Sequence, residues 1–169
     1  LSYEDQVAQY LPEFVGEVTL AELLTHSGGL WPDSTQASMW DWVNDAQDRY
    51  ADVTDIVAVR PPGDTGYRYN HQNYALLGEI IARVAGSPYG EACYERVIAP
   101  LGLSTAQRSP RYGAFLPWGG WEMSAADYAR FITAEFDADF DHSSFPNVPI
   151  GGGARYGMGT LFFEAEGLR

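Results

Sequence analysis

The chain of 169 residues carries 23 acidic residues against ten arginines and no lysine, giving a net charge of −13 at pH 7. This acidity argues against a nucleic-acid partner and against anionic membrane surfaces, because both are bound through clustered basic side chains. The single cysteine, Cys93, excludes a disulfide within the chain, and no apolar run reaches the length of about 20 residues that a membrane-spanning helix needs.

The first third of the chain indicates short helices separated by turns. We expect these helices over residues 3–11, 19–25, 36–47 and 52–59. The clearest start is Thr19 followed by Glu22, since a threonine three residues before a glutamate forms a capping box. Proline and glycine residues at positions 12, 28–29 and 61–63 punctuate this part of the chain and end helices there.

The strongest helical pattern lies in residues 72–85. Its apolar side chains recur with helical spacing, and Gly86 follows at the position where a helix often ends in the left-handed conformation. The predicted buried face consists of Tyr74, Leu77, Ile80, Ile81 and Val84.

The second half of the chain adds two helices and a little strand. Ser87 and Pro88 begin one helix, and Ser124 caps another. The apolar side chains expected on that last helix are Tyr128, Phe131 and Ile132. Residues 137–153 are a polar connection rich in glycine and proline, and the aromatic residues 156–165 indicate a strand. The predicted fold class is therefore mostly α with minor β.

A turn and a tyrosine precede the helix at residues 72–85. Residues 62–66 are rich in proline and glycine, and Tyr69 follows them just ahead of the helix. Such a tyrosine is held rigidly while its hydroxyl can face a cleft, which is where a proton-transfer group belongs. The alternative is an ordinary turn tyrosine with a hydrogen-bonded hydroxyl.

Residues 62–78 read P-G-D-T-G-Y-R-Y-N-H-Q-N-Y-A-L-L-G. They resemble the P-G-x-x-x-x-Y-S-N-x-x-Y-x-L-L-G turn of the serine hydrolases built like class C β-lactamases, penicillin-binding DD-peptidases and related esterases. Alignment on the shared N-Y and L-L-G places Tyr69 on the family's catalytic tyrosine. Asn70 then falls on its serine and His71 on its asparagine.

Further segments are similar to the same family and occur in the same order. They are residues 1–14 (L-S-Y-E-D-Q-V and Y-L-P-E-F), 23–30 (L-L-T-H-S-G-G-L), 100–105 (P-L-G-L-S-T), 119–131 (G-G-W-E-M-S-A-A-D-Y-A-R-F) and 156–159 (Y-G-M-G). No single segment is decisive, but together they span nearly the whole chain.

The resemblance implies that residues 1–169 are the central part of one β-lactamase-like domain, its helical subdomain region. The family's nucleophile lies in a Ser-x-x-Lys motif, which a chain without lysine does not contain. The family's third motif, Lys-Thr-Gly or His-x-Gly, is expected after the Y-G-M-G segment and is also missing. We therefore expect the Ser-x-x-Lys segment, the C-terminal strands and most of the main sheet to belong to remaining segments of a parent chain.

The resemblance also implies an activity and two site residues. The parent would cleave a small-molecule ester or amide, or a peptide, through an acyl-enzyme, as an esterase, β-lactamase or DD-peptidase. Tyr69 would be the general base and His71 a substrate-binding group. A phenol acts as a base only beside cations, and we expect Arg68 to point away from Tyr69, because alternate residues of an extended segment point apart.

His71 is the main departure from the family pattern, since an imidazole donates one hydrogen bond and titrates near neutrality. It leaves open a non-catalytic binding or scaffold homologue of the same fold. The isolated chain itself is expected to be inactive. His26, in the loop that ends the helix at residues 19–25, is expected to be a structural hydrogen-bonder rather than a catalytic base.

Neither a metal nor a cofactor is expected. Asp137, Asp139 and Asp141 are spaced as at the start of an EF-hand loop. His142 and Val148, however, stand where that loop needs glycine and glutamate. A solvated acidic loop is the preferred interpretation.

Overall fold

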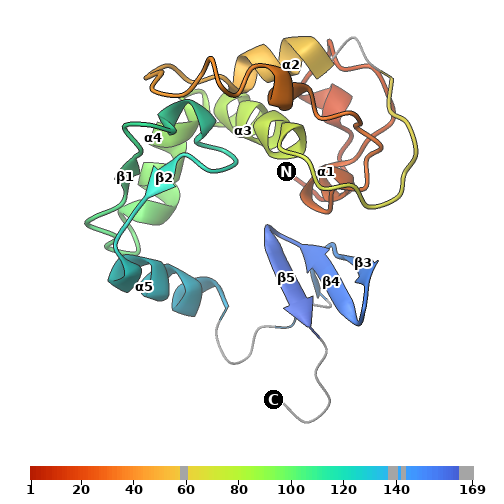
Figure 1. Ribbon diagram of the computed structural model, residues 1–169. Helices are drawn as coiled ribbons and strands as arrows, with labels where there is room; N and C mark the ends of the chain where they lie inside the picture. Colours follow the sequence, from red (N-terminus) through yellow and green to blue (C-terminus); the bar gives the residue numbers. More distant parts are fainter. Residues whose placement is uncertain (58–60, 137–140, 142–143, 164–169) are drawn as a thin grey trace.

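The computed structural model describes residues 1–57, 61–136, 141 and 144–163, and most of its regular structure is helical (Figure 1). The α-helices are α1 (Leu20–Leu24), α2 (Tyr50–Val57), α3 (Gln72–Ala85), α4 (Tyr89–Cys93) and α5 (Ala125–Glu135). A π-helical segment, Tyr94–Ile98, continues α4, and 3-10 turns occur at Val7–Gln9, Ser34–Ala37 and Gly113–Phe115. The predicted class, mostly α with minor β, is confirmed for these residues.

The strands form two small antiparallel sheets. One pairs β1 (Gln107–Arg108) with β2 (Trp121–Glu122), and the other has the order β3 (Val148–Gly151), β4 (Ala154–Gly157) and β5 (Thr160–Phe163). The segment predicted as one strand, residues 156–165, is therefore a hairpin as far as it is described. Met158 and Gly159 form its two-residue turn, and both have positive φ, as the tightest hairpins require.

Helix α3 is the centre of the helical layer and contacts α1, α2 and α4. Its limits and its left-handed ending at Gly86, with φ 69°, are as predicted. Its buried face is as predicted only in part, at Ile80 and at Leu77, which packs against the core. Ala75, Leu76 and Ile80 are buried in the main core, whereas Val84 is 52% exposed. The helix is apolar on two sides, and the packing of its neighbours decides which side is covered.

Two predicted helices near the N-terminus are reduced to 3-10 turns. Within residues 3–11 only Val7–Gln9 is helical, because Gln6 bridges to Thr19 and the Val7 N–H donates to the Val18 carbonyl at 2.8 Å. Within residues 36–47 the helical part is the end of Ser34–Ala37. The prediction for residues 52–59 is met by α2, which begins earlier, while residues 58–59 lie outside the described part.

The capped helices agree with the sequence at their starts. The Thr19–Glu22 capping box is present at α1, and the Ser124 hydroxyl accepts from the Asp127 N–H at the start of α5. The apolar face expected on α5 is not buried, however, since Tyr128 is 56% exposed. Asp127 is the buried residue of that helix, and its carboxylate accepts from the Thr105 N–H at 2.7 Å.

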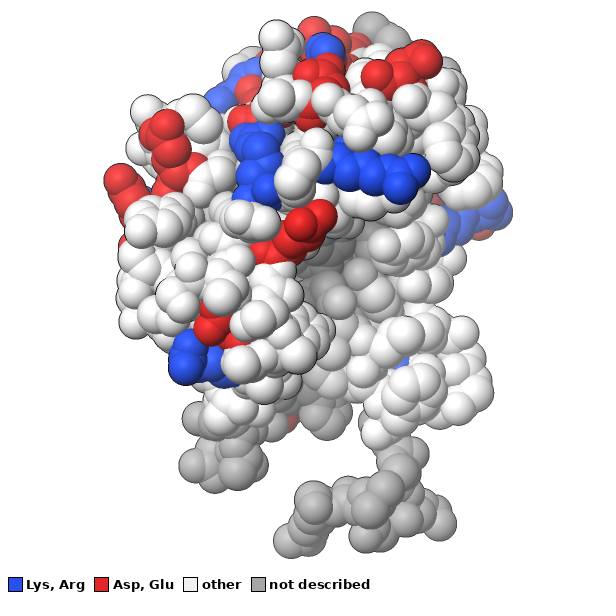
Figure 2. Space-filling model, turned by 60° about the vertical axis from the view of Figure 1, so that its left-hand side comes forward, with Lys and Arg blue, Asp and Glu red and all other residues white. Residues whose placement is uncertain are grey.

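Charges of both signs are interspersed on the face shown in Figure 2, where arginines lie close to acidic side chains. Arg108 pairs with Asp48 at 2.6 Å, and Arg83 pairs with Glu13 and Glu79. Among the described residues, no helix combines the length and apolar character needed to cross a membrane.

Candidate active site

A cavity of about 220 Å³ contains both residues that the sequence singled out. It lies where the turn before α3 meets the end of α1 and strand β4. Its lining consists of His26, Tyr69, Asn70, His71, Tyr74, Pro117, Trp118, Tyr156 and Gly159. A larger hollow of about 600 Å³ lies beside α4 and β1, but neither Tyr69 nor His71 lines it.

Tyr69 projects into open space while its surroundings are fixed. Its side chain is 52% exposed, and its ring centroid lies 4.5 Å from that of His26 and 6.1 Å from that of Tyr156. The chain is anchored on both sides. The Arg68 N–H donates to the His26 carbonyl at 2.9 Å, and the buried Asn70 amide donates to the Leu30 carbonyl at 2.9 Å. An anchored backbone with an exposed phenol is the arrangement expected of a proton-transfer group.

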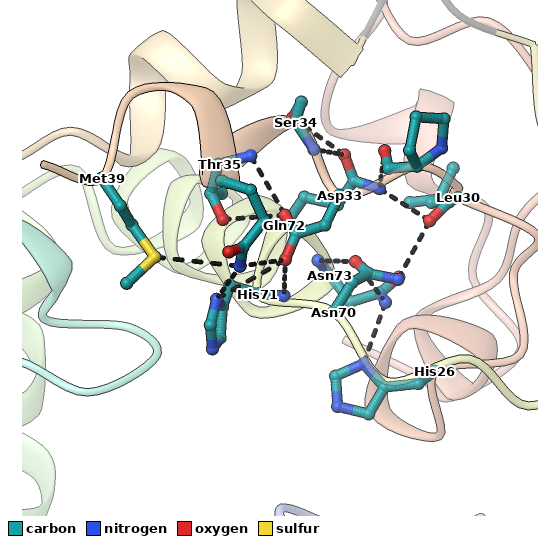
Figure 3. A network of polar contacts seen from close by, with 12 residues as sticks. His26, Leu30, Asp33, Ser34, Thr35, Met39, Asn70, His71, Gln72 and Asn73 are labelled. Carbon is teal, nitrogen blue, oxygen red and sulfur yellow. Dashed lines mark hydrogen bonds and ion pairs between the residues drawn. The ribbon is translucent and has the colours of Figure 1, made fainter.

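His71 lies beside Tyr69, with 5.7 Å between the two ring centroids. Its backbone N–H donates to the Asp33 carboxylate at 3.0 Å, and its Nδ1 lies 3.5 Å from the same carboxylate and 3.3 Å from Nε2 of Gln36 (Figure 3). These contacts hold the Nδ1 edge of the ring. Nε2 is the ring nitrogen left for a ligand in the cavity.

Asp33 joins the loop after α1 to the start of α3. Although burial opposes ionisation, hydrogen bonds from the backbone of His71 and from Thr35 hold the pKa of the Asp33 carboxyl below its usual value. The buried side chain of Gln72 makes a second link, because its Oε1 accepts from Ser34 and its Nε2 donates to the Leu30 carbonyl (Figure 3). No motif in the sequence singles out Asp33 or Gln72.

His26 forms the floor beneath Tyr69 and is 2% exposed. Nδ1 lies 2.9 Å from the side-chain nitrogen of Asn73, and Nε2 lies 3.1 Å from the Tyr156 hydroxyl. Both ring nitrogens are thus used, which confirms the predicted hydrogen-bonding role. Burial, helped by the nearby His71, lowers the pKa of His26 to about 4. The T-H-S-G motif marks this residue in the sequence, but its place under Tyr69 depends on folding.

The basic side chain next to Tyr69 is directed elsewhere, as alternation predicts. The Arg68 guanidinium lies over the Trp31 ring, 5.7 Å from its centroid, and 3.8 Å from the Asp64 carboxylate. No arginine is among the residues that line the cavity.

Sequence reasoning missed the walls of the cavity that come from distant segments. Pro117 and Trp118 follow the turn at Gly113–Phe115, and Tyr156 comes from β4. The indole N–H of Trp118 is buried without a hydrogen-bond partner among the described residues. Within that same part of the chain, no three His, Cys, Asp or Glu side chains gather as a metal site. Asp137 and Asp139 of the EF-hand-like pattern lie outside it.

Comparison with known proteins gives the same family as the motifs. The sequence profile of the family described as Beta-lactamase matches residues 1–165. Penicillin-binding protein 4 of Amycolatopsis lactamdurans is 30% identical over 117 residues, which cover 65% of this chain and 30% of that protein. A D-aminopeptidase of Cereibacter sphaeroides is 30% identical over 113 residues, covering 63% of this chain and 22% of that protein. The matched part of the chain thus spans less than a third of the length of each of these two relatives.

Solved structures share the fold. A D-stereospecific amidohydrolase from Streptomyces superposes with a TM-score of 0.80 at 20% identity, over 98% of this chain and 65% of that one. The D-amino acid amidase of Ochrobactrum anthropi superposes with a TM-score of 0.76 at 20% identity, over 99% of this chain and 60% of that one. From its motifs and its family profile, this chain belongs to the beta-lactamase-like serine hydrolases, and its sequence is similar to a penicillin-binding protein and a D-aminopeptidase.

Proposed function

We propose that the protein containing this chain hydrolyses an ester or amide through an acyl-enzyme, with Tyr69 as general base and His71 as a substrate-binding group. One observation carries the proposal: the phenol of Tyr69 and the imidazole of His71 line the same cavity, held from behind by His26 and Asp33. The names of the relatives, a D-aminopeptidase and a D-amino acid amidase, favour an amide as substrate.

The proposed role of Tyr69 is to take the proton from a serine hydroxyl as that oxygen attacks the substrate carbonyl. A phenol in water titrates near pH 10, so it becomes an effective base only beside cationic groups. The lining residues include no arginine, and the chain contains no lysine. We infer that the serine and its lysine come from remaining segments of the parent chain, and that the 169 residues alone do not turn over substrate.

The proposed role of His71 is to donate a hydrogen bond to the substrate carbonyl. The side-chain nitrogen of Gln36 lies 3.3 Å from Nδ1, and when Nδ1 accepts from that amide the ring proton is on Nε2, on the cavity side. A neutral imidazole then supplies one donor where the family's asparagine supplies an amide. This difference favours simple amides and esters, for which a single donor to the carbonyl is sufficient.

The test uses the full-length protein and a fluorophosphonate probe, which labels an activated serine. Tyr69→Phe should slow labelling and amide hydrolysis by about 10²-fold or more, the usual contribution of a positioned base. Tyr67→Phe is the matched control, since Tyr67 precedes the site on the same turn but does not line the cavity. Equal rates for the wild type and Tyr69→Phe would refute the assignment.

A non-catalytic binding homologue is the second candidate, and His71 in place of the family's asparagine favours it. It predicts that the full-length wild type remains unlabelled by fluorophosphonate and releases no product from amides or esters. Labelling of a single serine in the full-length protein would exclude it. Turnover by the isolated 169-residue chain would instead contradict the proposed origin of the nucleophile.

A further inference from the structure

We propose that His26 is a positioning residue for Tyr69, fixed as the neutral imidazole with its proton on Nε2 and tied by that proton to strand β4. The inference rests on the proposed function of Tyr69. It assigns a role in the site to a side chain that is not itself expected to touch the substrate, because His26 is almost completely buried.

The orientation of the network begins at two backbone carbonyls. The side-chain nitrogen of Asn70 donates to Leu30 O at 2.9 Å and to Arg68 O at 3.0 Å, so the side-chain oxygen of Asn70 must face the other way (Figure 3). That oxygen accepts from the side-chain nitrogen of Asn73 at 2.9 Å. An inverted Asn73 amide would bring two acceptor oxygens together, so its NH₂ group is fixed on this side.

The second N–H of the Asn73 amide fixes the state of His26. It points to Nδ1 at 2.9 Å, and Nδ1 must therefore be the unprotonated, accepting nitrogen. The fixed direction leaves the Asn73 side-chain oxygen buried with no partner in the described part of the chain, which is a cost of keeping this arrangement. With Nδ1 accepting, the proton of the neutral ring lies on Nε2 and is donated to the Tyr156 hydroxyl at 3.1 Å.

A second tyrosine beside the imidazole is held by a third backbone carbonyl. Because the Tyr156 oxygen accepts from His26, its own proton is free to be donated. The ring centroid of Tyr74 lies 5.1 Å from that of His26, and the Tyr74 hydroxyl donates to Leu24 O at 3.1 Å. The donor and the acceptor of each hydrogen bond in the series from Asn70 to Tyr156 are thus assigned.

This series ties three distant segments together under the Tyr69 ring. His26 comes from the loop after α1, Asn73 from α3 and Tyr156 from β4. The ring centroids of His26 and Tyr69 are 4.5 Å apart. A proton on Nδ1 would oppose the Asn73 N–H and break the series. Small displacements of a catalytic group slow the reaction strongly, since a displacement of about 1 Å can lower the rate by about 10²-fold.

The surroundings of His26 favour the neutral ring. The rings of Tyr67, Tyr69, Tyr74 and Tyr156 face it. Two titratable groups of other segments act on it, His71 opposing a charge on the imidazole and Asp33 favouring one. Burial and His71 outweigh Asp33, which agrees with a neutral side chain at physiological pH.

Two experiments on the full-length protein test the proposal. Long-range ¹H–¹⁵N NMR on ¹⁵N-histidine-labelled protein reports the tautomer of each ring, and the signal lost in His26→Asn identifies His26. We expect the Nε2–H form to persist from about pH 8 to about pH 5. A cationic ring or an Nδ1–H tautomer at neutral pH would overturn the proposal, whatever the enzyme's activity.

Kinetics then separate positioning from simple structural support. His26→Asn keeps a short polar side chain that suits the left-handed backbone at φ 54°, and Tyr156→Phe removes only the acceptor of the Nε2 proton. We expect kcat to fall about tenfold or more for His26→Asn, with a smaller loss for Tyr156→Phe, while KM changes by less than about threefold. Folding is checked by circular dichroism, and Tyr156→Phe remains informative if His26→Asn does not fold.

The failures of the two proposals are distinguishable. If Tyr69→Phe is inactive while His26→Asn and Tyr156→Phe retain full kcat, the role of His26 is refuted and that of Tyr69 stands. If Tyr69→Phe is fully active, the proposed function fails and the positioning role fails with it, although the NMR result still decides the protonation state of His26.

Discussion

The buried imidazole of His26 should make the stability of this protein depend on pH in a defined window. In the folded chain the pKa of His26 is lowered to about 4 from an ordinary value of 6.5, chiefly by burial. As the pH falls, the unfolded chain therefore binds the proton first. The contribution of the neutral His26 to the free energy of unfolding is complete above about pH 6.5. It is lost progressively between about pH 6.5 and pH 4 and changes no further below that range.

The size of the effect follows from the shift. One pKa unit corresponds to about 1.4 kcal/mol, so a shift of roughly two and a half units is worth about 3 kcal/mol over the whole window. Between about pH 7 and pH 5 the linkage relation gives a loss of roughly 2 kcal/mol. Solvent screening does not reduce this figure much, because the side chain is 2% exposed.

Urea denaturation followed by tryptophan fluorescence, on the full-length protein at the two pH values, measures this loss. The comparison is with His26→Asn, which has no imidazole at this position and should lack the extra loss of about 2 kcal/mol. His71→Gln is the control, because it removes the other histidine of the cavity; since burial is the larger cause of the lowered pKa of His26, this variant should keep most of the pH-dependent loss. If the wild type and His26→Asn lose the same free energy of unfolding between the two pH values, the account of His26 is wrong.

Three further substitutions test the packing around the site, each by its free energy of unfolding. A Cβ on Gly78 would lie 2.3 Å from Pro117 Cγ, so Gly78→Ala should destabilise the protein by about 1–3 kcal/mol despite its better helix propensity, and should disturb the cavity wall. Gly119→Ala, with no atom within 4 Å of the added Cβ, is its control and should be nearly neutral. Gln72→Leu should lower the free energy of unfolding by at least about 2 kcal/mol, because the buried Ser34 hydroxyl and Leu30 carbonyl would lose the hydrogen bonds that Gln72 makes to them. An unchanged stability would show that water replaces the amide. Thr19→Ala should cost about 1 kcal/mol, and no loss at all would mean that the capping box contributes nothing.

The features predicted correctly from the sequence depend on residues that are close together in the chain. The capping box at Thr19, the cap at Ser124 and the left-handed ending at Gly86 each depend on groups within a few residues. Tyr69 and His71 are also close in the chain, and the turn before α3 brings both to one cavity, while their roles stay predictions. Local geometry is enough to specify such contacts.

The errors concern contacts between distant segments. The pattern of residues 3–11 permits a helix, but the bridge of Gln6 to Thr19 uses the backbone differently. On α3, Leu76 and Val84 are equally apolar, and only the former is buried in the core. A periodic pattern identifies an apolar face, but where a helix has two such faces its neighbours determine which one is covered.

The sequence by itself determined the family motifs, the helix α3 with the turn before it, and the candidate pair Tyr69 and His71. Tertiary structure alone decided that His26 lies beneath the phenol and that Tyr156 of a distant strand receives its proton. The physical reason is that caps and turns are satisfied by adjacent residues. The direction of a buried hydrogen-bond series is instead set by the carbonyls of Leu30 and Arg68, which no local motif relates to the histidine.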